Sequence, residues 1–142
     1  MASTFREHCV FCQICGENPA GTELLVSAED LVAIRDIRPI AKHHFLVVAR
    51  EHIRNVKSLT KEHKPLLQRM VSVAEQVLRD HNADMADYTL GFHWPPFCFY
   101  AHLHLHVFSP TTGMKLINRI FFKENSCWFV SPEFVMSKLE CQ

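Results

Sequence analysis

Residues 101–110 read AHLHLHVFSP, a stretch in which histidine recurs at every second position, as His102, His104 and His106. Successive side chains of a β-strand point to opposite faces of the sheet. A strand at this place therefore puts the three imidazoles on one face. The leucines between them belong to the other face, where we expect them to pack on the hydrophobic core.

Such a row of histidines can bind a metal, act in catalysis, or simply lie on a wet sheet surface. Alternate residues of a strand are about 6.6 Å apart, so three histidines can share one ion only with severe distortion. A central nucleophile with two flanking donors suits the row better, because a neutral imidazole can attack an electrophile such as phosphorus. In this interpretation His104 attacks, while His102 and His106 support the surrounding oxygens and protonate a leaving group.

The composition is that of an ordinary globular protein, with 48% hydrophobic and 21% charged residues among 142. A chain of this length is expected to form one domain over residues 1–142, with a short flexible N-terminus of about residues 1–6. Lys and Arg together number 15, as do Asp and Glu. This balance gives no strong signal for nucleic-acid binding and none for a membrane surface.

No apolar run approaches the roughly 18 residues that span a bilayer, and the N-terminal sequence lacks the apolar region of a secretion signal. We therefore expect a cytoplasmic or nuclear protein whose six cysteines are free or metal-bound rather than paired as disulfides. The four glycines are too far apart for a P-loop or a GxGxxG turn. A nucleotide would thus be bound without a glycine-rich cradle.

Hydrophobic periodicity predicts an α+β fold with an antiparallel sheet of about five strands, one long helix and a short C-terminal helix. The long helix is expected from about Ser58 to His81, with Thr60 as its N-cap. The expected strands are residues 22–27, 31–36, 43–49, 88–93 and 99–108. The remaining segments are a short helix or turn within 9–20, a hydrophobic stretch at 116–122 and a helix at 132–139.

Residues 102–108 match the His-φ-His-φ-His-φ-φ signature of the histidine triad (HIT) superfamily. Upstream, DIRP at 36–39, HFLVV at 44–48 and HI at 52–53 resemble a block of the Hint branch, with Ala49 in place of its usual proline. The resemblance implies a HIT-like fold.

Three further segments, GFH at 91–93, PPF at 95–97 and WFV at 128–130, most resemble the third type of histidine triad nucleotide-binding protein. In all, the resemblance covers about residues 9–139. It implies a nucleotide phosphoramidase that hydrolyses adenosine 5′-monophosphoramidate-type bonds, in AMP-amines or aminoacyl-adenylates, through a covalent nucleotidyl-histidine. The implied partners are AMP-type purine nucleotides and a second copy of the chain in a homodimer, and catalysis requires no cofactor.

The resemblance also assigns residues to roles. His104 becomes the nucleophile, and His102 and His106 orient it and support charge on the phosphoryl oxygens. Asp36 matches the ribose-binding acid, although a turn residue after a strand is its plain alternative. The expected nucleotide-binding residues are Phe11, Ile14, Ile34, Asp36, Ile37, His104, Leu105 and His106. The apolar members of this set are more often simply core residues.

Two more histidines are expected beside the site, His44 as a structural neighbour and His93 as a further polar group. Hint relatives often carry a serine three positions before the first triad histidine, where it helps the phosphoryl or leaving group. Phe99 occupies that position here. His93 is a candidate for the missing function, and a loop residue is the alternative.

Cys9 and Cys12 have the spacing of a metal-ligand pair. In some relatives such a pair binds zinc together with the histidine that ends the third strand and the first triad histidine, which correspond to His52 and His102. A structural zinc site and free buried thiols both stay open at this point.

Two alternatives to a phosphoramidase remain. The missing serine favours a nucleotide-binding scaffold or regulatory protein with weak or no activity. An aprataxin-like deadenylating hydrolase would use the same histidine chemistry, but the balanced charge disfavours a nucleic-acid surface. A turnover assay with an adenosine phosphoramidate separates an enzyme from a scaffold.

Overall fold

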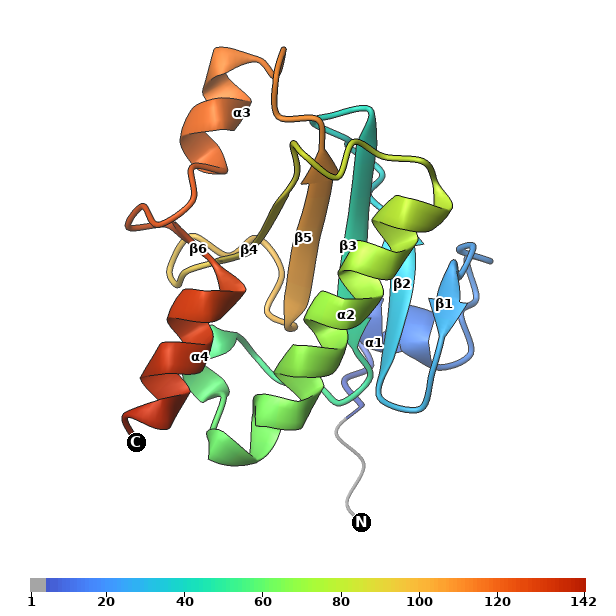
Figure 1. Cartoon of the computed structure of the whole chain (residues 1–142). Helices are drawn as coiled ribbons and strands as arrows, with labels where there is room; N and C mark the ends of the chain where they lie inside the picture. The colour runs from blue at the N-terminus through green and yellow to red at the C-terminus, as the bar shows by residue number, and fades with distance from the viewer. Residues whose placement is uncertain (1–4) are drawn as a thin grey trace.

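A computed structural model describes residues 5–142, which fold around one six-stranded antiparallel sheet (Figure 1). The strand order across the sheet is β1-β2-β3-β5-β4-β6. The prediction of an α+β fold with an antiparallel sheet is confirmed, with six strands in place of about five. Residues 1–4 of the expected flexible N-terminus lie outside the described residues. The strands are β1 Val26–Ser27, β2 Leu31–Arg35, β3 His43–Ala49, β4 Thr89–His93, β5 His104–Ser109 and β6 Phe129–Val130.

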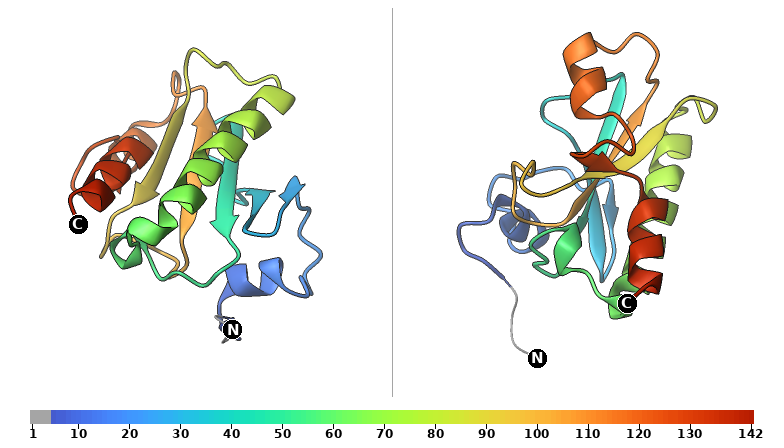
Figure 2. Two further views of the ribbon diagram at one scale, coloured as in Figure 1. Left: turned by 60° about the horizontal axis from the view of Figure 1, so that its bottom comes forward. Right: turned by 90° about the vertical axis from the view of Figure 1, so that its left-hand side faces the viewer.

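Helices cover both faces of this sheet (Figure 2). In Figure 2, α2 and α4 lie against one face, and α1 lies against the opposite face. Within residues 5–142, no helix is long and apolar enough to cross a membrane. The helices are α1 Val10–Cys15, α2 Lys64–Asp80, α3 Leu116–Phe121 and α4 Pro132–Glu140, with 3-10 turns at Val56–Ser58 and Lys61–His63.

The long helix α2 begins at Lys64, six residues later than the sequence predicts. Thr60 starts the 3-10 turn that precedes α2 instead of the helix itself, since its main-chain N–H donates to Nδ1 of His63 at 2.9 Å. Pro65 follows in the first turn of α2, where its missing N–H leaves no hydrogen bond broken. The buried residues of α2, which recur at helical spacing and pack on the sheet, are Leu67, Met70, Ala74, Val77 and Leu78.

Strand alternation divides the buried side chains between two clusters, one on each face of the sheet. The main core lies under α2 and includes Leu105 and Val107 of β5, as the sequence predicts. Burial of each such side chain stabilises the fold by about 1.5–3 kcal/mol. The smaller cluster, on the α1 face, consists of Phe11, Ile14, Val32, Ile34, Leu46 and Val48. His104 and His106 therefore face the side of the sheet that α1 covers.

The predicted strand at 99–108 is wrong over its first five residues, because β5 begins at His104. The last rung between β3 and β5 pairs Val48 with His104. Leu103 instead donates its N–H to the carbonyl of Ile53 at 2.7 Å, and accepts from the N–H of Ala49. This path ties residue 103 to the segment that follows β3. His102 consequently lies outside the strand and does not continue the row of histidines.

Smaller differences concern strand lengths and the C-terminal region. The strand predicted at 22–27 is reduced to β1, and the next strand ends at Arg35 rather than Asp36. The hydrophobic stretch at 116–122 forms α3, and β6 was not predicted at all. β6 pairs with the end of β4. Because β6 has only two residues, it leaves no alternating pattern in the sequence.

Candidate active site

A cavity of about 650 Å³ opens on the face of the sheet that carries α1. Its size lies in the range of small-molecule sites, roughly 300–1,000 Å³. It brings together most of the side chains that the sequence predicts for a nucleotide site. The predicted residues that line it are Phe11, Ile14, Ile34, Asp36, Ile37, His44, His93, His104 and His106.

The buried wall of the cavity is apolar and comes from α1, β2 and β3. Phe11, Ile14 and Ile34 form it as predicted, and Leu46 joins them. Leu46 was missed, although it stands two residues after His44 and so faces the same side of β3. Ile37 differs from the others, because 85% of its surface is exposed and it lies at the cavity mouth.

Leu105 does not fit its predicted place beside the nucleotide. Its side chain is fully buried in the main core, on the opposite face of the sheet from the cavity. The strand alternation that sends His104 and His106 to the cavity sends Leu105 away from it. Only the main chain of this residue can contribute to the site.

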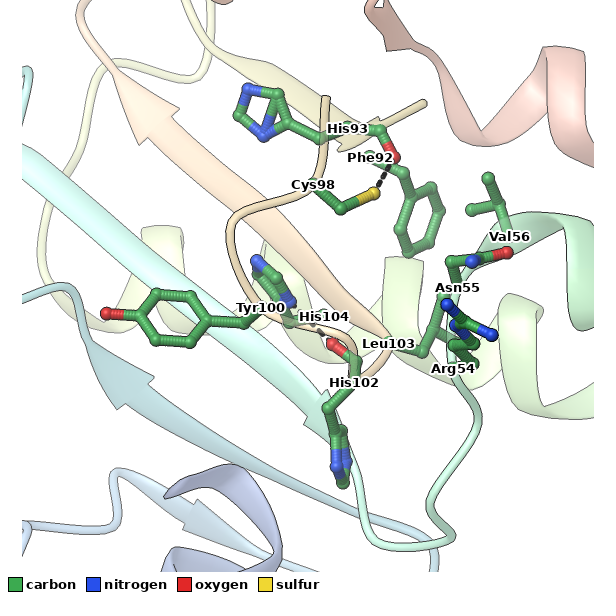
Figure 3. A pocket seen from close by; sticks show the side chains of 10 residues that line it. All are labelled: Arg54, Asn55, Val56, Phe92, His93, Cys98, Tyr100, His102, Leu103 and His104. Carbon is green, nitrogen blue, oxygen red and sulfur yellow. Dashed lines mark hydrogen bonds between the residues drawn. The ribbon is translucent and has the colours of Figure 1, made fainter. Parts of the chain in front are cut away.

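The tautomer of His104 is set by a hydrogen bond to the main chain. Its Nδ1 lies 2.7 Å from the carbonyl oxygen of His102, as the dashed line in Figure 3 marks. A carbonyl can only accept, so Nδ1 carries the proton and Nε2 keeps its lone pair. Burial lowers the pKa of His104, which keeps the ring neutral. The arrangement leaves an unprotonated nitrogen for attack on an electrophile.

A second chain of hydrogen bonds sets the tautomer of His106. The main-chain N–H of Ile40 donates to Nδ1 of His44 at 3.2 Å, so a neutral His44 carries its proton on Nε2. That Nε2 lies 3.0 Å from Nδ1 of His106 and donates to it. Burial lowers the pKa of His44 to about 4, which keeps the ring neutral near pH 7. His106 is then left with an Nε2–H that can donate to a ligand.

Asp36 follows β2 and lies beside this relay. One carboxylate oxygen, Oδ1, accepts the main-chain N–H of Arg38 at 2.8 Å, and Oδ2 lies 3.3 Å from Nε2 of His44. The side chain keeps about 15% of its surface exposed and lines the cavity. A partly exposed carboxylate with remaining acceptor capacity can receive hydrogen bonds from ligand hydroxyl groups.

His93 ends β4 and is 8% exposed. Its Nε2 is buried without a hydrogen-bond partner, which is costly for a polar atom unless a ligand or water satisfies it. The ring stands nearly perpendicular to that of His106, with centroids 4.9 Å apart. Burial, followed by the charge of His104, lowers its pKa to about 4. His93 thus brings an unsatisfied neutral imidazole to the cavity.

Several cavity residues were not predicted from the sequence. Phe99 and Tyr100 stand in the loop between β4 and β5, and Asn118 and Phe122 come from α3 and the residue after it. The ring of Tyr100 lies 5.3 Å from that of Phe11, so the loop reaches across the mouth of the cavity. Hydrophobic periodicity does not predict these contacts, because they depend on how the long loops between strands fold back over the sheet.

The comparison with known proteins agrees with this geometry. The sequence profile of the family described as "Scavenger mRNA decapping enzyme C-term binding" matches residues 8–121. "Adenosine 5'-monophosphoramidase HINT3" of Xenopus tropicalis is 41% identical over 133 residues, which are 93% of this chain and 87% of that protein. The chain belongs to the histidine triad superfamily.

Other HIT relatives extend the likeness. "Adenosine 5'-monophosphoramidase HINT3" of Mus musculus is 37% identical over 137 residues, covering 95% of this chain and 83% of that protein. Among solved structures, the "HIT family hydrolase from Clostridium thermocellum Cth-393" is 29% identical, with a TM-score of 0.70 over 78% of this chain and 98% of that chain. The family that the triad motif predicts is therefore confirmed.

The first histidine of this HIT triad points elsewhere than the other two. Figure 3 shows the ring of His102 directed away from that of His104. Its Nε2 lies 2.6 Å from the carbonyl of Ala49 and must donate to it, so Nδ1 keeps its lone pair. His102 is not among the residues that line the large cavity. The ring still lies on the α1 side of the sheet, as predicted, with its centroid 5.7 Å from that of Phe11, but it stands outside the cavity that His104 and His106 line.

The free nitrogen of His102 faces Cys9, Cys12 and His52, and these four residues are termed the Cys/His cluster. All four ligand atoms lie within 4.8 Å of one another. Nδ1 of His102 is 3.2 Å from Sγ of Cys9, 3.6 Å from Sγ of Cys12 and 3.1 Å from Nδ1 of His52. Tetrahedral zinc holds its nitrogen and sulfur ligands about 3.3–3.8 Å apart. The donor set and its spacing fit a four-coordinate zinc ion.

Proposed function

We propose that this HIT protein is a nucleotide phosphoramidase that hydrolyses the P–N bond of AMP-amines through a covalent intermediate on His104. The single observation that carries the proposal is the hydrogen bond from Nδ1 of His104 to the carbonyl of His102, which leaves Nε2 as a nucleophile. The relatives named adenosine 5′-monophosphoramidase, at 37–41% identity over more than 90% of the chain, support the same activity.

The first step forms a bond between Nε2 of His104 and the α-phosphorus and breaks the bond to the leaving amine. The attacking and leaving atoms lie roughly in line in such displacements. The Nε2–H of His106 donates a hydrogen bond to a phosphoryl oxygen and stabilises its developing charge, while the departing amine takes its proton from solvent. Water then attacks the nucleotidyl-histidine and releases a proton to solvent. The products are the free amine and AMP, and His104 recovers its lone pair.

Other residues position these groups. His102 acts through its carbonyl oxygen, which holds the His104 ring, and not through its imidazole. His44 keeps His106 in the tautomer that donates. His93, with its unsatisfied Nε2, is the polar group that replaces the serine missing at Phe99 and supports the phosphoryl or leaving group.

The nucleoside is held by the apolar wall and by Asp36. Phe11, Ile14 and Ile34 contact the base, and Asp36 accepts hydrogen bonds from the ribose hydroxyl groups. The substitution Asp36→Asn should raise KM for an AMP-amine several-fold and leave KM for the 2′,3′-dideoxy analogue nearly unchanged. Equal effects on the two substrates would remove Asp36 from ribose recognition.

The activity is tested by mass spectrometry after rapid mixing with an adenosine phosphoramidate. Wild-type protein should gain one adenylyl group and release AMP, whereas His104→Ala should show neither. A wild-type protein that binds AMP but forms no adduct and no product would be a nucleotide-binding scaffold. Full turnover by His104→Ala would refute the mechanism.

A structural zinc ion in the Cys/His cluster is a further part of the proposal. The four ligands would close its coordination sphere, so the metal would stabilise α1 and the segment around His52 and leave catalysis to His104. Support comes from the lone pair that the Ala49 carbonyl leaves on His102. The ion would link α1 and the segment around His52 to His102, which lies two residues before the nucleophile.

We also propose that the chain forms a homodimer. Four residues of the short helix α3 expose apolar side chains, which is unusual for a surface that has no partner. They are Leu116, Ile117, Ile120 and Phe121. The outer face of the long helix α2 carries polar residues such as Gln68, Ser72 and Gln76 and offers no comparable apolar surface. Light scattering should give twice the monomer mass, and Leu116→Asp should shift it toward the monomer.

A further inference from the structure

Two aromatic side chains at the mouth of the cavity keep half or more of their surface exposed. Phe99 is 82% exposed and Tyr100 is 50% exposed, yet both line the cavity. They follow one another in the loop between β4 and β5. Large aromatic side chains bury up to 150–250 Å² each when they find a partner, so their exposure here leaves contact area free for a ligand.

Contacts of residues other than Phe99 hold the conformation of the loop between β4 and β5. The N–H of Phe97 donates to the carbonyl of Trp94 at 2.9 Å, and Sγ of Cys98 donates to the carbonyl of His93 at 3.2 Å. The Phe97 ring packs on Trp128 with centroids 6.2 Å apart. The Phe99 ring lies near that of His93 at the edge of the cavity, with centroids 6.3 Å apart. These contacts make Phe99 dispensable for the fold.

The geometry of the displacement indicates which part of the substrate contacts Phe99 and Tyr100. The nucleoside takes the buried wall beside Phe11 and Asp36, and the phosphorus lies above Nε2 of His104. In-line displacement places the leaving group opposite the attacking nitrogen, and so away from the sheet. In that direction lies the mouth of the cavity, which Phe99 and Tyr100 line. The Tyr100 ring stands 6.3 Å from that of His104, within reach of a group bonded to the phosphorus.

We propose that Phe99 and Tyr100 form an aromatic shelf that binds the leaving group, so that the enzyme selects phosphoramidates whose amine carries an aromatic or large apolar group. This inference rests on the proposed phosphoramidase activity. Phe99 stands at the position where Hint relatives often carry a polar serine. The replacement exchanges a hydrogen-bonding group for a contact surface. Phe99 is therefore a specificity residue that touches the leaving group and takes no proton.

The test compares two adenosine phosphoramidates whose amines have similar basicity, one made from phenethylamine and one from butylamine. Wild-type enzyme should prefer the phenethylamine substrate by about 5–10-fold in kcat/KM, the size expected for one aromatic contact. Phe99→Ser should remove most of this preference, so that the ratio of the two kcat/KM values approaches one. Phe99→Tyr should keep the preference, because the ring remains.

Phe97→Ala is the matched control, since Phe97 is a half-exposed aromatic residue of the same loop that does not line the cavity. It should behave as the wild type toward both substrates. Equal kcat/KM for the two substrates in the wild type, or an undiminished preference in Phe99→Ser, would refute the shelf and leave the phosphoramidase activity standing. No turnover of either substrate by the wild type would overturn both proposals.

Discussion

Nδ1 of His104 donates a 2.7 Å hydrogen bond to the main-chain carbonyl of His102, while the His102 ring itself points into the Cys/His cluster. The first and second histidines of the triad are thus connected through the backbone. A side-chain substitution at residue 102 leaves that carbonyl in place. The roles of the two residues can therefore be separated by mutation.

We predict that His102→Ala retains measurable phosphoramidase activity, whereas His104→Ala loses it by about a thousandfold or more. The alanine at 102 still offers a carbonyl to position the nucleophile. The substitution His102→Ala mainly removes one side chain of the Cys/His cluster, so we expect a lower melting temperature. Initial-rate assays and thermal unfolding of both variants provide the measurement. Equal losses of kcat/KM would show that the His102 ring takes part in the reaction.

A second prediction concerns the metal. Protein purified without chelators should contain about one zinc ion per chain, and Cys12→Ser should lose most of it because one ligand is removed. The same variant should melt at a lower temperature, and a chelator should lower the wild-type melting temperature toward it. Elemental analysis and calorimetry measure the two effects. The exposed Cys127 is the control, since Cys127→Ser should keep both the zinc and the stability.

A third prediction follows from the relay through His44. His44→Leu removes the donor that faces Nδ1 of His106, so His106 is no longer held in the tautomer with a proton on Nε2. We expect kcat to fall about 100-fold with little change in KM, as for loss of a positioned donor to the charge that develops in the transition state. His44→Gln should recover part of the rate, because its amide can donate at the same place. A leucine variant with normal kcat would argue that the tautomer of His106 does not limit the reaction.

The sequence was sufficient for the parts of the site that depend on strand alternation. Leu105 and Val107 pack on the core and His104 and His106 face the cavity, because the period of two holds along all of β5. Leu103 still joins the core and His102 still faces α1, but Leu103 bonds to the segment after β3, and the His102 ring lies outside the cavity. A pattern in one segment cannot report a hydrogen bond that another segment offers.

Long-range packing explains the remaining differences. The Cys9 and Cys12 pair could be placed beside His52 and His102 only through the family resemblance, since the four residues come from three separate parts of the chain. Phe122 enters the cavity because the chain crosses back over the sheet after β5, and no periodic signal marks that return. Asp36 and the apolar wall, which follow from local motif and strand pattern, lie together as expected.

A fourth prediction concerns the close approach of β4 to β6. Gly91 pairs with His106 in the sheet, and a Cβ at residue 91 would lie 2.1 Å from the buried ring of Phe129. Gly91→Ala should therefore destabilise the protein by about 1–3 kcal/mol through overpacking. The displaced ring also contacts His93, so activity should fall as well.

Denaturant unfolding measures the loss of stability in Gly91→Ala. The double variant Gly91→Ala/Phe129→Leu makes room for the added methyl group and should recover part of the lost free energy. Stability in Gly91→Ala equal to that of the wild type would mean that the contact between the two strands yields without cost.

A fifth prediction concerns pH and His93. Burial lowers the pKa of His93 to about 4, against about 6.5 for an unfolded chain. Between these values the unfolded state binds a proton that the folded state does not, so stability is full above about pH 6.5 and declines as the pH falls toward 4. The difference corresponds to about 3 kcal/mol. His93→Phe keeps an aromatic ring that cannot titrate and should flatten this part of the profile.

Urea unfolding at pH 7.5 and pH 4.5 measures the contribution of His93 as a difference between two proteins. Other buried histidines, His44 among them, also disfavour the folded state at low pH, so the wild type and His93→Phe should both lose stability. The wild type should lose about 2–3 kcal/mol more than the variant. His8→Gln is the control for loss of a histidine at an exposed position, where the substitution removes no buried contact. Identical losses in wild type and His93→Phe would mean that the folded protein accepts a proton on His93, and that its Nε2 is open to solvent or to an acceptor after all.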